Sequence, residues 1–190
     1  MGKGISNEDY KNSNLTITES KITTDLALEE VMMDWEDPLM QEHANIVCHN
    51  QGDILEFGFG MGISANYIQA LNPSSHTIIE IHPQIWNNLE TWAEGKSNVN
   101  IINADWIDVV ETLGQFDGIF FDTYGDVNWE KWFYEYWDSR MKPGGKMTYF
   151  NQHDENDFYN IGATFHSVSI TPDPNEYFNR NTYYVPTVNY

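Results

Sequence analysis

This 190-residue sequence has one cysteine, few basic residues and no long apolar run, and each shortage excludes a class of protein. The lone Cys48 cannot form a disulfide within the chain, which favours a reducing compartment such as the cytoplasm. Nine Lys and Arg against 29 Asp and Glu give a formal net charge of −20, so we expect no nucleic-acid partner, because nucleic acids bind basic surfaces. No run of about 18 apolar residues is present, and the polar residues 1–14 lack the apolar core of a signal peptide, so we expect neither a membrane span nor secretion.

Two common kinds of catalytic site are also missing from the sequence. The six histidines show no HxH or HxxxH spacing and there is no cysteine cluster, so we expect no metal site. There is no G-x-S-x-G motif, and Cys48 has no partner at a motif spacing, so neither Ser nor Cys is indicated as a nucleophile. What the chain has in excess is negative charge. It suits a cationic ligand, although most single acids are solvated surface residues.

Length and composition predict a single domain over residues 1–190. Apolar residues make up 41% of the chain and aromatic residues 15%, enough for a sizeable core. We expect a flexible lid or tail at 1–24 and a helical cap segment at 25–50. Thr24 is placed to cap a helix that begins near Asp25, and Pro38 suits the first turn of a second helix. Residues 51–190 are expected to form the cofactor-binding core.

From residue 53 onward, strand and helix patterns alternate. We expect strands at 53–58, 76–81, 99–103, 116–122 and 146–151, and helices at 63–71, 83–94, near 106–112 and at 128–140. Residues 142–145 (KPGG) are a predicted tight turn before the last of these strands. Such alternation is typical of an α/β, Rossmann-like, mostly parallel sheet with helices on both faces. The β-rich, proline-containing tail at 166–190 is expected to add an antiparallel C-terminal hairpin to the sheet edge.

The most informative stretch is residues 56–62, where an acid that ends an apolar run is followed by Gly58, Gly60 and Gly62. Glycine lets the backbone approach a ligand closely, and the N-terminus of the next helix offers free N–H groups. Glu80 ends the next apolar run about 20 residues on, where an acid can hold two ribose hydroxyls. The pattern indicates a nucleotide or nucleoside ligand, with a purely structural turn as the alternative. The third glycine comes too early for the dinucleotide fingerprint, which argues against NAD.

Two further acids stand where predicted strands end. Asp122 ends the buried run 116–122, and ligands of open α/β sheets gather at the carboxyl ends of strands, so Asp122 is well placed to act on a substrate. Asp105 can accept a hydrogen bond from an adenine amino group, with Trp106 as a wall of the site. The alternative for this pair is a helix-capping aspartate and a core tryptophan. We interpret Asp117, at the start of its strand, as a structural turn residue.

These segments together resemble a known family. Residues 56–62 (EFGFGMG), Glu80, residues 116–124 (FDGIFFDTY) and 142–145 are similar to class I S-adenosylmethionine-dependent methyltransferases. More narrowly, residues 31–40 (VMMDWEDPLM), the Phe-Gly-Met turn and residues 122–124 resemble guanidinoacetate N-methyltransferases. The related arginine δ-N-methyltransferases share much of this, and their acid followed by His-Pro matches Glu80, His82 and Pro83 somewhat better. Periodicity alone favours a different reading of 31–38, an amphipathic helix with an exposed Glu36.

The resemblance implies S-adenosylmethionine as the cofactor and a role for each matching residue. Glu36 and Asp122 would be the catalytic pair that grips a guanidino group, and Met32, Gln152 and His153 would also bind the substrate. The cofactor-binding residues would be Tyr10, Phe59, Gly60, Met61, Gly62, Ile63, Ser64, Glu80, Ile81, His82, Ala104 and Asp105. Two departures concern the acceptor. The chain is much shorter after residue 151, where the family has a further long helix, and residues 152–154 (QHD) replace the family's carboxylate-binding loop.

The implied activity is N-methylation of a small guanidino substrate, with guanidinoacetate, giving creatine, as the leading acceptor. Two carboxylates suit a guanidinium, because each can accept N–H bonds in a bidentate fork and one can take up the proton. We expect Asp122 to be the general base and Glu36 the orienting partner. The alternatives are methyl transfer to arginine, free or in a protein, or to another small amine, and a non-catalytic S-adenosylmethionine-binding protein. The oligomeric state is not indicated.

Overall fold

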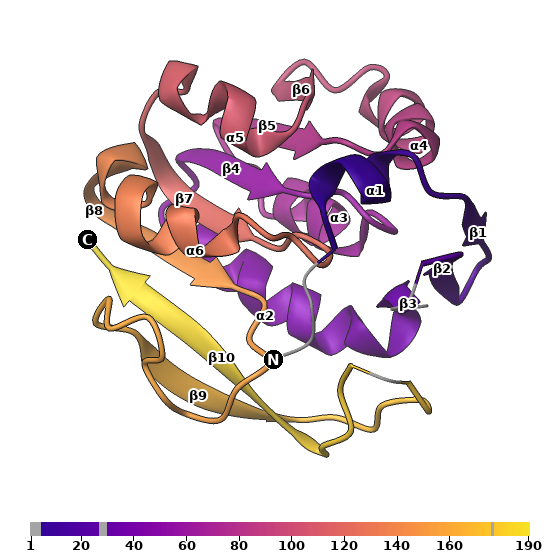
Figure 1. Ribbon diagram of the computed structural model, residues 1–190. Coiled ribbons are helices and arrows are strands. Elements are labelled where there is room, and N and C mark those ends of the chain that lie inside the picture. The colour runs from indigo at the N-terminus through magenta and orange to yellow at the C-terminus, as the bar shows by residue number, and fades with distance from the viewer. Residues whose placement is uncertain (1–4, 27–29, 176) are drawn as a thin grey trace.

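The central sheet has seven strands in the order β6-β5-β4-β7-β8-β10-β9 (Figure 1). In chain order these are β4 (Asp53–Phe57), β5 (Ser75–Glu80), β6 (Val99–Asn103), β7 (Phe116–Phe121), β8 (Met141–Tyr149), β9 (Thr164–Ser169) and β10 (Thr182–Asn189). All pairs among β4 to β8 are parallel, and β10 is antiparallel to β8 and to β9. The predicted mostly parallel sheet with an antiparallel C-terminal hairpin is therefore confirmed. The computed structural model describes residues 5–26, 30–175 and 177–190.

Helices connect the parallel strands as the alternating pattern predicts. They are α3 (Ile63–Ala70), α4 (Pro83–Ala93), and α5 (Trp106–Val109) with a 3-10 turn at Val110–Thr112. The predicted helix at 128–140 is present but irregular, with α6 (Trp129–Lys131), a π-helical turn (Trp132–Tyr136) and a 3-10 turn (Asp138–Arg140). After β8 the chain runs as a loop over 150–163 directly to β9, with no helix between them. None of the described helices is long and apolar enough to cross a bilayer.

The N-terminal segment differs from the prediction. After α1 (Asn7–Lys11), the strands β1 (Leu15–Ile17), β2 (Lys21–Thr24) and β3 (Glu30–Met33) form a small antiparallel sheet. The helix predicted to begin near Asp25 is therefore wrong over 30–33, because this segment is a strand that pairs with β2. Residues 27–29 of the predicted helix and residues 1–4 of the predicted lid lie outside the described residues. A 3-10 turn (Asp34–Glu36) follows, and α2 (Asp37–Val47) carries Pro38 in its first turn, as expected.

The turn predicted at 142–145 is also wrong, because these residues lie inside β8. The strand begins at Met141 rather than at 146, and its register against β7 shifts between Phe116 and Gly118. Gly144 has a φ of +83°, so a glycine-rich sequence here marks an irregular strand. The N–H of Gly144 donates to the carbonyl oxygen of Tyr190 (2.8 Å), and the N–H of Tyr190 donates to that of Gly145 (3.0 Å).

Apolar side chains on both faces of the sheet are covered, and β7 shows this most clearly. Phe120 packs into a cluster with Met40 and Val47 of α2, whereas Phe121 packs on the opposite face with Trp106 and Trp132. This alternation is expected of a central strand buried on both sides. The C-terminal end of α2 fits tightly against β7, because a Cβ on Gly118 would lie 2.1 Å from the carbonyl oxygen of Val47.

Candidate active site

The carboxyl ends of β4 to β8 open onto one cavity of about 580 Å³, within the range of small-molecule sites. Strand order reverses between β4 and β7, so this is the topological switch point at which open α/β sheets bind ligands. Chain segments around α1 and β3, and loops after β8 and β9, complete the walls. The predicted site residues that line the cavity are Tyr10, Met32, Glu36, Phe59, Gly60, Ser64, Glu80, Ile81, Ala104, Asp105, Asp122, Gln152 and His153.

The glycine turn forms the floor between β4 and α3. Gly58, Gly60 and Gly62 have φ values of +84°, +53° and +73°. A Cβ on Gly58 would lie 2.4 Å from the carbonyl oxygen of Asp122, and one on Gly60 would lie 2.6 Å from Sδ of Met32. Glycine is therefore needed both for the left-handed backbone and for the close approach to the residues on either side. The turn thereby holds Asp122 and Met32 at the same cavity.

Glu80 is buried and supports this turn from the end of β5. Its carboxylate accepts hydrogen bonds from the backbone N–H groups of Phe59 (2.9 Å) and His82 (2.7 Å). Burial raises the pKa of Glu80, and these hydrogen bonds oppose the rise. Carboxylate oxygens have about four lone-pair sites between them, so Glu80 can also accept from ligand hydroxyls in the cavity.

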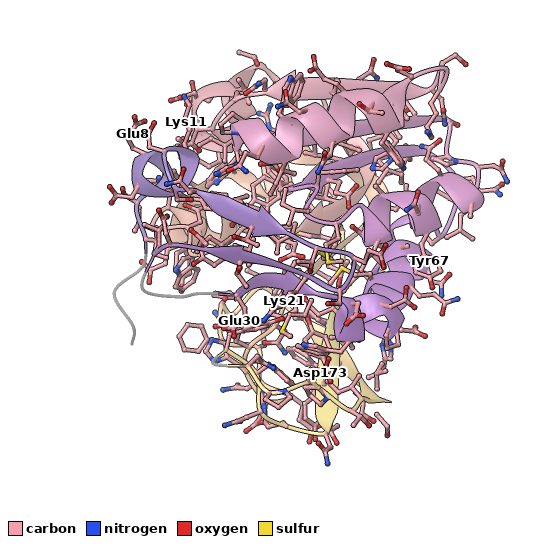
Figure 2. All side chains as sticks on the ribbon, turned by 90° about the vertical axis from the view of Figure 1, so that its right-hand side faces the viewer. Glu8, Lys11, Lys21, Glu30, Tyr67 and Asp173 are labelled. Carbon is pink, nitrogen blue, oxygen red and sulfur yellow. The ribbon has the colours of Figure 1, made fainter. Side chains whose placement is uncertain are left out.

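Asp105 combines a local capping role with a place in the cavity wall. It accepts hydrogen bonds from the N–H of Ile107 (3.3 Å), which caps α5, and from the side-chain amide of Asn7 in α1 (2.8 and 3.0 Å). Trp106 is a buried core residue and also lines the cavity, so both expectations for it hold, and its Nε1 donates to Asp126 at 2.5 Å. Because Asn7 bonds to Asp105, α1 is held against the cavity, while Glu8 and Lys11 on its other side point into solvent (Figure 2).

Glu36 is only 3% exposed, so the exposed Glu36 that periodicity favours is wrong. The period misleads because residues 30–36 are a strand and a 3-10 turn rather than a helix. Oε1 of Glu36 accepts hydrogen bonds from the N–H of Met33 (2.8 Å) and from the hydroxyl of Tyr177 (2.6 Å). Burial raises the pKa of Glu36 to about 7, although these two hydrogen bonds lower it.

Asp122 follows β7 and faces the same cavity. Its pKa is raised well above the ordinary value, first by burial and then by the charges of Glu36 and Glu56. Glu56 is itself held by Ser64 and by His76, whose Nε2 lies 2.8 Å away. Among the described residues that line the cavity, six are acids and none is Lys or Arg. This set of acids, with no Lys or Arg among the described lining residues, favours a cationic ligand.

Several backbone groups of the loop after β8 already form hydrogen bonds within the protein. The N–H of Asn151 donates to the Tyr183 hydroxyl (2.6 Å), and the N–H of His153 donates to Oδ1 of Asn151 (2.9 Å). Arg180 binds the carbonyl oxygens of Gln152 (2.7 Å) and His153 (3.3 Å), and also Asp154. Gln152 and His153 therefore line the cavity on a loop that is already well braced.

Comparison with known proteins identifies the family. The family model of guanidinoacetate N-methyltransferase matches residues 4–169. The chain belongs to the guanidinoacetate N-methyltransferase family. It is 32% identical to protein arginine N-methyltransferase 2 of Candida glabrata over 76% of this chain, and 29% identical to the Saccharomyces cerevisiae protein of that name over 96%. These alignments span 38% and 51% of the two relatives' own lengths. Its fold is similar to that of the N-methyltransferase NodS from Bradyrhizobium japonicum, with a TM-score of 0.61, 12% identity, and coverage of 82% of this chain and 87% of that one.

Membership of a methyltransferase family implies S-adenosylmethionine as the cofactor of this chain, and the cavity fits it. An all-acidic set of charged residues suits a cationic sulfonium, and the glycine turn provides close backbone. Gly60 and Ser64 would hold the methionine part, Glu80 the ribose, and Asp105 the adenine. Tyr10, whose ring packs on those of His82 (5.0 Å between centroids) and Tyr124 (4.8 Å), would close this end.

Four predicted cofactor residues do not line the cavity: Met61, Gly62, Ile63 and His82. They shape its surroundings instead. The N–H of Met61 donates to Sδ of Met32 (3.3 Å), Gly62 precedes α3, and Ile63 packs towards the core near α2. Nδ1 of His82 accepts from the N–H of Gln84 (3.2 Å) at the start of α4, so Nε2 carries the proton that bonds to the Ser13 carbonyl (3.2 Å).

Several lining residues were missed by sequence reasoning. Asn7 lies in the helix α1 and Glu30 in the strand β3, neither of which was predicted, and Tyr177 comes from the loop between β9 and β10. Tyr177 lies 141 residues from its partner Glu36, and no motif marks either the tyrosine or that pairing. The only available signal was indirect: a buried glutamate needs hydrogen-bond donors.

Proposed function

We propose that this chain is an S-adenosylmethionine-dependent N-methyltransferase that acts on a guanidino nitrogen. The observation that carries the proposal is the pair of acids Glu36 and Asp122, which face one cavity beside the glycine turn with no Lys or Arg lining it among the described residues. A guanidinium is planar and cationic and presents five N–H donors, so it supplies both the charge and the hydrogen bonds that two carboxylates lack.

The roles of the acids follow from their surroundings. When bound, the cofactor supplies an electrophilic methyl group on a sulfonium. Glu36 orients the acceptor through an N–H bond, and Asp122 accepts the proton that the nitrogen loses as it bonds to the methyl carbon. The raised pKa of Asp122 makes its carboxylate a stronger base, while the bound guanidinium keeps it ionised until the proton is transferred. Aromatic lining residues such as Phe133 and Tyr159 exclude water.

Two acceptors are candidates, and they differ in whether a carboxylate accompanies the guanidino group. Guanidinoacetate is supported by the name of the matching family model. Arginine within a polypeptide is supported by the names of the relatives and by the cavity itself. The N–H groups of Asn151 and His153 are already bonded within the protein, and His153 is the only basic side chain among the described lining residues. A substrate carboxylate would therefore have to bind through Gln152 or the His153 side chain, with no Lys or Arg lining residue to pair with among the described residues, which favours an arginine side chain.

A methyl-transfer screen tests both the function and the acceptor. Labelled S-adenosylmethionine is incubated with guanidinoacetate, free arginine, an N-acetylated and amidated arginine, an arginine-containing peptide and glycine. We expect guanidino acceptors to be used and glycine not, with the blocked arginine at least as good as guanidinoacetate. Preference for guanidinoacetate would select the creatine-forming activity. Transfer to no guanidino compound, with calorimetric binding of the cofactor intact, would refute the proposed activity in favour of a binding-only protein.

A further inference from the structure

Tyr177, in the loop between β9 and β10, lines the cavity and contacts Glu36, one of the two acids proposed to bind the acceptor. We propose that Tyr177 is a positioning residue of the acceptor site, which fixes Glu36 by occupying one of its carboxylate oxygens and leaves the other oxygen to the acceptor. The inference rests on the proposed function, because it assigns a role within that acceptor site.

The hydrogen bonds of Glu36 define which oxygen is free. Oε1 accepts from Met33 N–H at 2.8 Å and from the Tyr177 hydroxyl at 2.6 Å, which uses both of its lone-pair sites. No hydrogen bond to Oε2 is found among the described parts of the chain. Glu36 can therefore accept N–H bonds from an acceptor only through Oε2, and a bidentate fork across both carboxylate oxygens is left to Asp122.

Tyr177 is itself held in place, as a positioning residue must be. Its ring stacks on Trp35, with centroids 5.8 Å apart and planes at 28°. Oδ1 of Asn175 accepts hydrogen bonds from the N–H groups of Tyr177 (3.0 Å) and Phe178 (2.6 Å), and Phe178 also stacks on Trp35. The loop between β9 and β10 thereby presents the hydroxyl in one direction. The loop of the C-terminal hairpin thus contributes the Tyr177 hydroxyl to a site whose other residues come from earlier in the chain.

The charges around this contact make the tyrosine a permanent donor. Burial, followed by the neighbouring Glu36, raises the pKa of Tyr177 far above its ordinary range, and Asp122 and Glu30 act in the same direction. Burial also raises the pKa of Tyr183, and the charges of Asp122 and Glu36 act in the same direction. The Tyr177 hydroxyl therefore stays protonated and stabilises the ionised form of Glu36, which lowers the pKa of that carboxyl relative to a site without it.

Tyr177→Phe tests this role because it removes the hydroxyl and keeps the ring on Trp35. The carboxyl carbon of Glu36, assigned by its loss in Glu36→Gln, is titrated by carbon-13 NMR. We expect the midpoint of this titration to rise by about one pH unit, because the free energy of a hydrogen bond to a charged group corresponds to about that pKa shift. The acidic limb of kcat/KM should move up with it, and the value above that limb should fall about tenfold. Tyr134→Phe removes a hydroxyl from a tyrosine that is 62% exposed and does not line the cavity, and it should change neither quantity.

The outcomes separate this inference from the proposed function. An unchanged Glu36 midpoint in Tyr177→Phe overturns the assignment whether or not the protein is active. A shifted midpoint with kcat/KM unchanged also overturns it, because the contact would then not position the acceptor. Failure of the proposed function would appear as an absence of methyl transfer by the unmodified protein, which the NMR titration does not require.

Discussion

At the scale of single residues, Asp122 is the group on which the proposed proton transfer depends. Asp122→Asn keeps the size and the hydrogen-bonding shape of the side chain and removes its basicity. We expect kcat to fall about 10²–10⁴-fold, the usual contribution of a general base, while affinity for S-adenosylhomocysteine changes little. Asp117→Asn is the matched control near the opposite end of β7, because Asp117 bonds to Lys142 (2.7 Å) and to the N–H of Asp53 (2.8 Å) and does not line the cavity. Near-normal turnover in Asp122→Asn would exclude the role.

Glu36 carries a second prediction, which concerns stability. Its pKa is about 7 in the folded protein against 4.5 ordinarily, so the folded state holds more protons between these values. Stability contributed by this group is therefore full below about pH 4.5 and is lost as pH rises through about 7. Glu36→Gln has no such loss and keeps an oxygen for Met33 and Tyr177. Denaturant unfolding should find it more stable than the unmodified protein by about 1–3 kcal/mol at pH 8, with the difference shrinking towards pH 5. An equal difference at both pH values would contradict the titration of Glu36 as its source.

The acids of the site differ in how far they could be predicted from sequence. Glu80, Asp105 and Asp122 could be placed together because parallel strands bring their carboxyl ends to one edge. Glu36 could be assigned to the site only through the family resemblance, because the periodicity of the sequence predicted it on an exposed helix face. Its contact with Tyr177 could not be predicted, because it depends on how the C-terminal loop folds back over a segment 141 residues away.

At the scale of elements, the glycine turn can be tested by two alanine substitutions that cause the same backbone strain, because both glycines have nearly the same positive φ. Gly58 and Gly144 have φ values of +84° and +83°, but a Cβ on Gly58 would lie 2.4 Å from the Asp122 carbonyl oxygen and one on Gly144 would meet nothing within 4 Å. Gly58→Ala should therefore lose both stability and affinity for S-adenosylhomocysteine, whereas Gly144→Ala should lose about 1 kcal/mol of stability and no affinity. Thermal unfolding and calorimetry measure the two effects. Equal affinity in both variants would show that the turn's approach to Asp122 is not needed for cofactor binding.

Helices and strands could be predicted where the hydrophobic pattern was long, and the predictions failed where it was short. β4 to β7 are bounded by helices that supply their own periodicity, so alternation was enough. β3 has four residues, and an apolar run of that length does not distinguish a strand from a helix; only its pairing with β2 decides. In β8, the Pro-Gly-Gly sequence signals a turn locally, but pairing with β7 keeps the segment in the sheet.

At the scale of the whole molecule, the net charge of −20 should draw cationic acceptors towards the site. For a peptide in which arginine is flanked by lysines, kcat/KM should fall several-fold between 0.01 and 0.15 M salt, because the screening length shrinks from about 30 to about 8 Å. Guanidinoacetate, which is net neutral, is the control and should show little dependence.

Two acids on the face in Figure 2 separate local from overall charge. Glu30 lines the cavity and Asp173 is exposed outside it, so Glu30→Gln and Asp173→Asn remove the same charge at different places. If steering comes from the cavity, only Glu30→Gln should lower kcat/KM for the lysine-flanked peptide at low salt, and the difference should vanish at high salt. Equal losses in the two variants would instead attribute the attraction to the overall charge, and a loss that persists at high salt would mean that Glu30 contacts the acceptor directly.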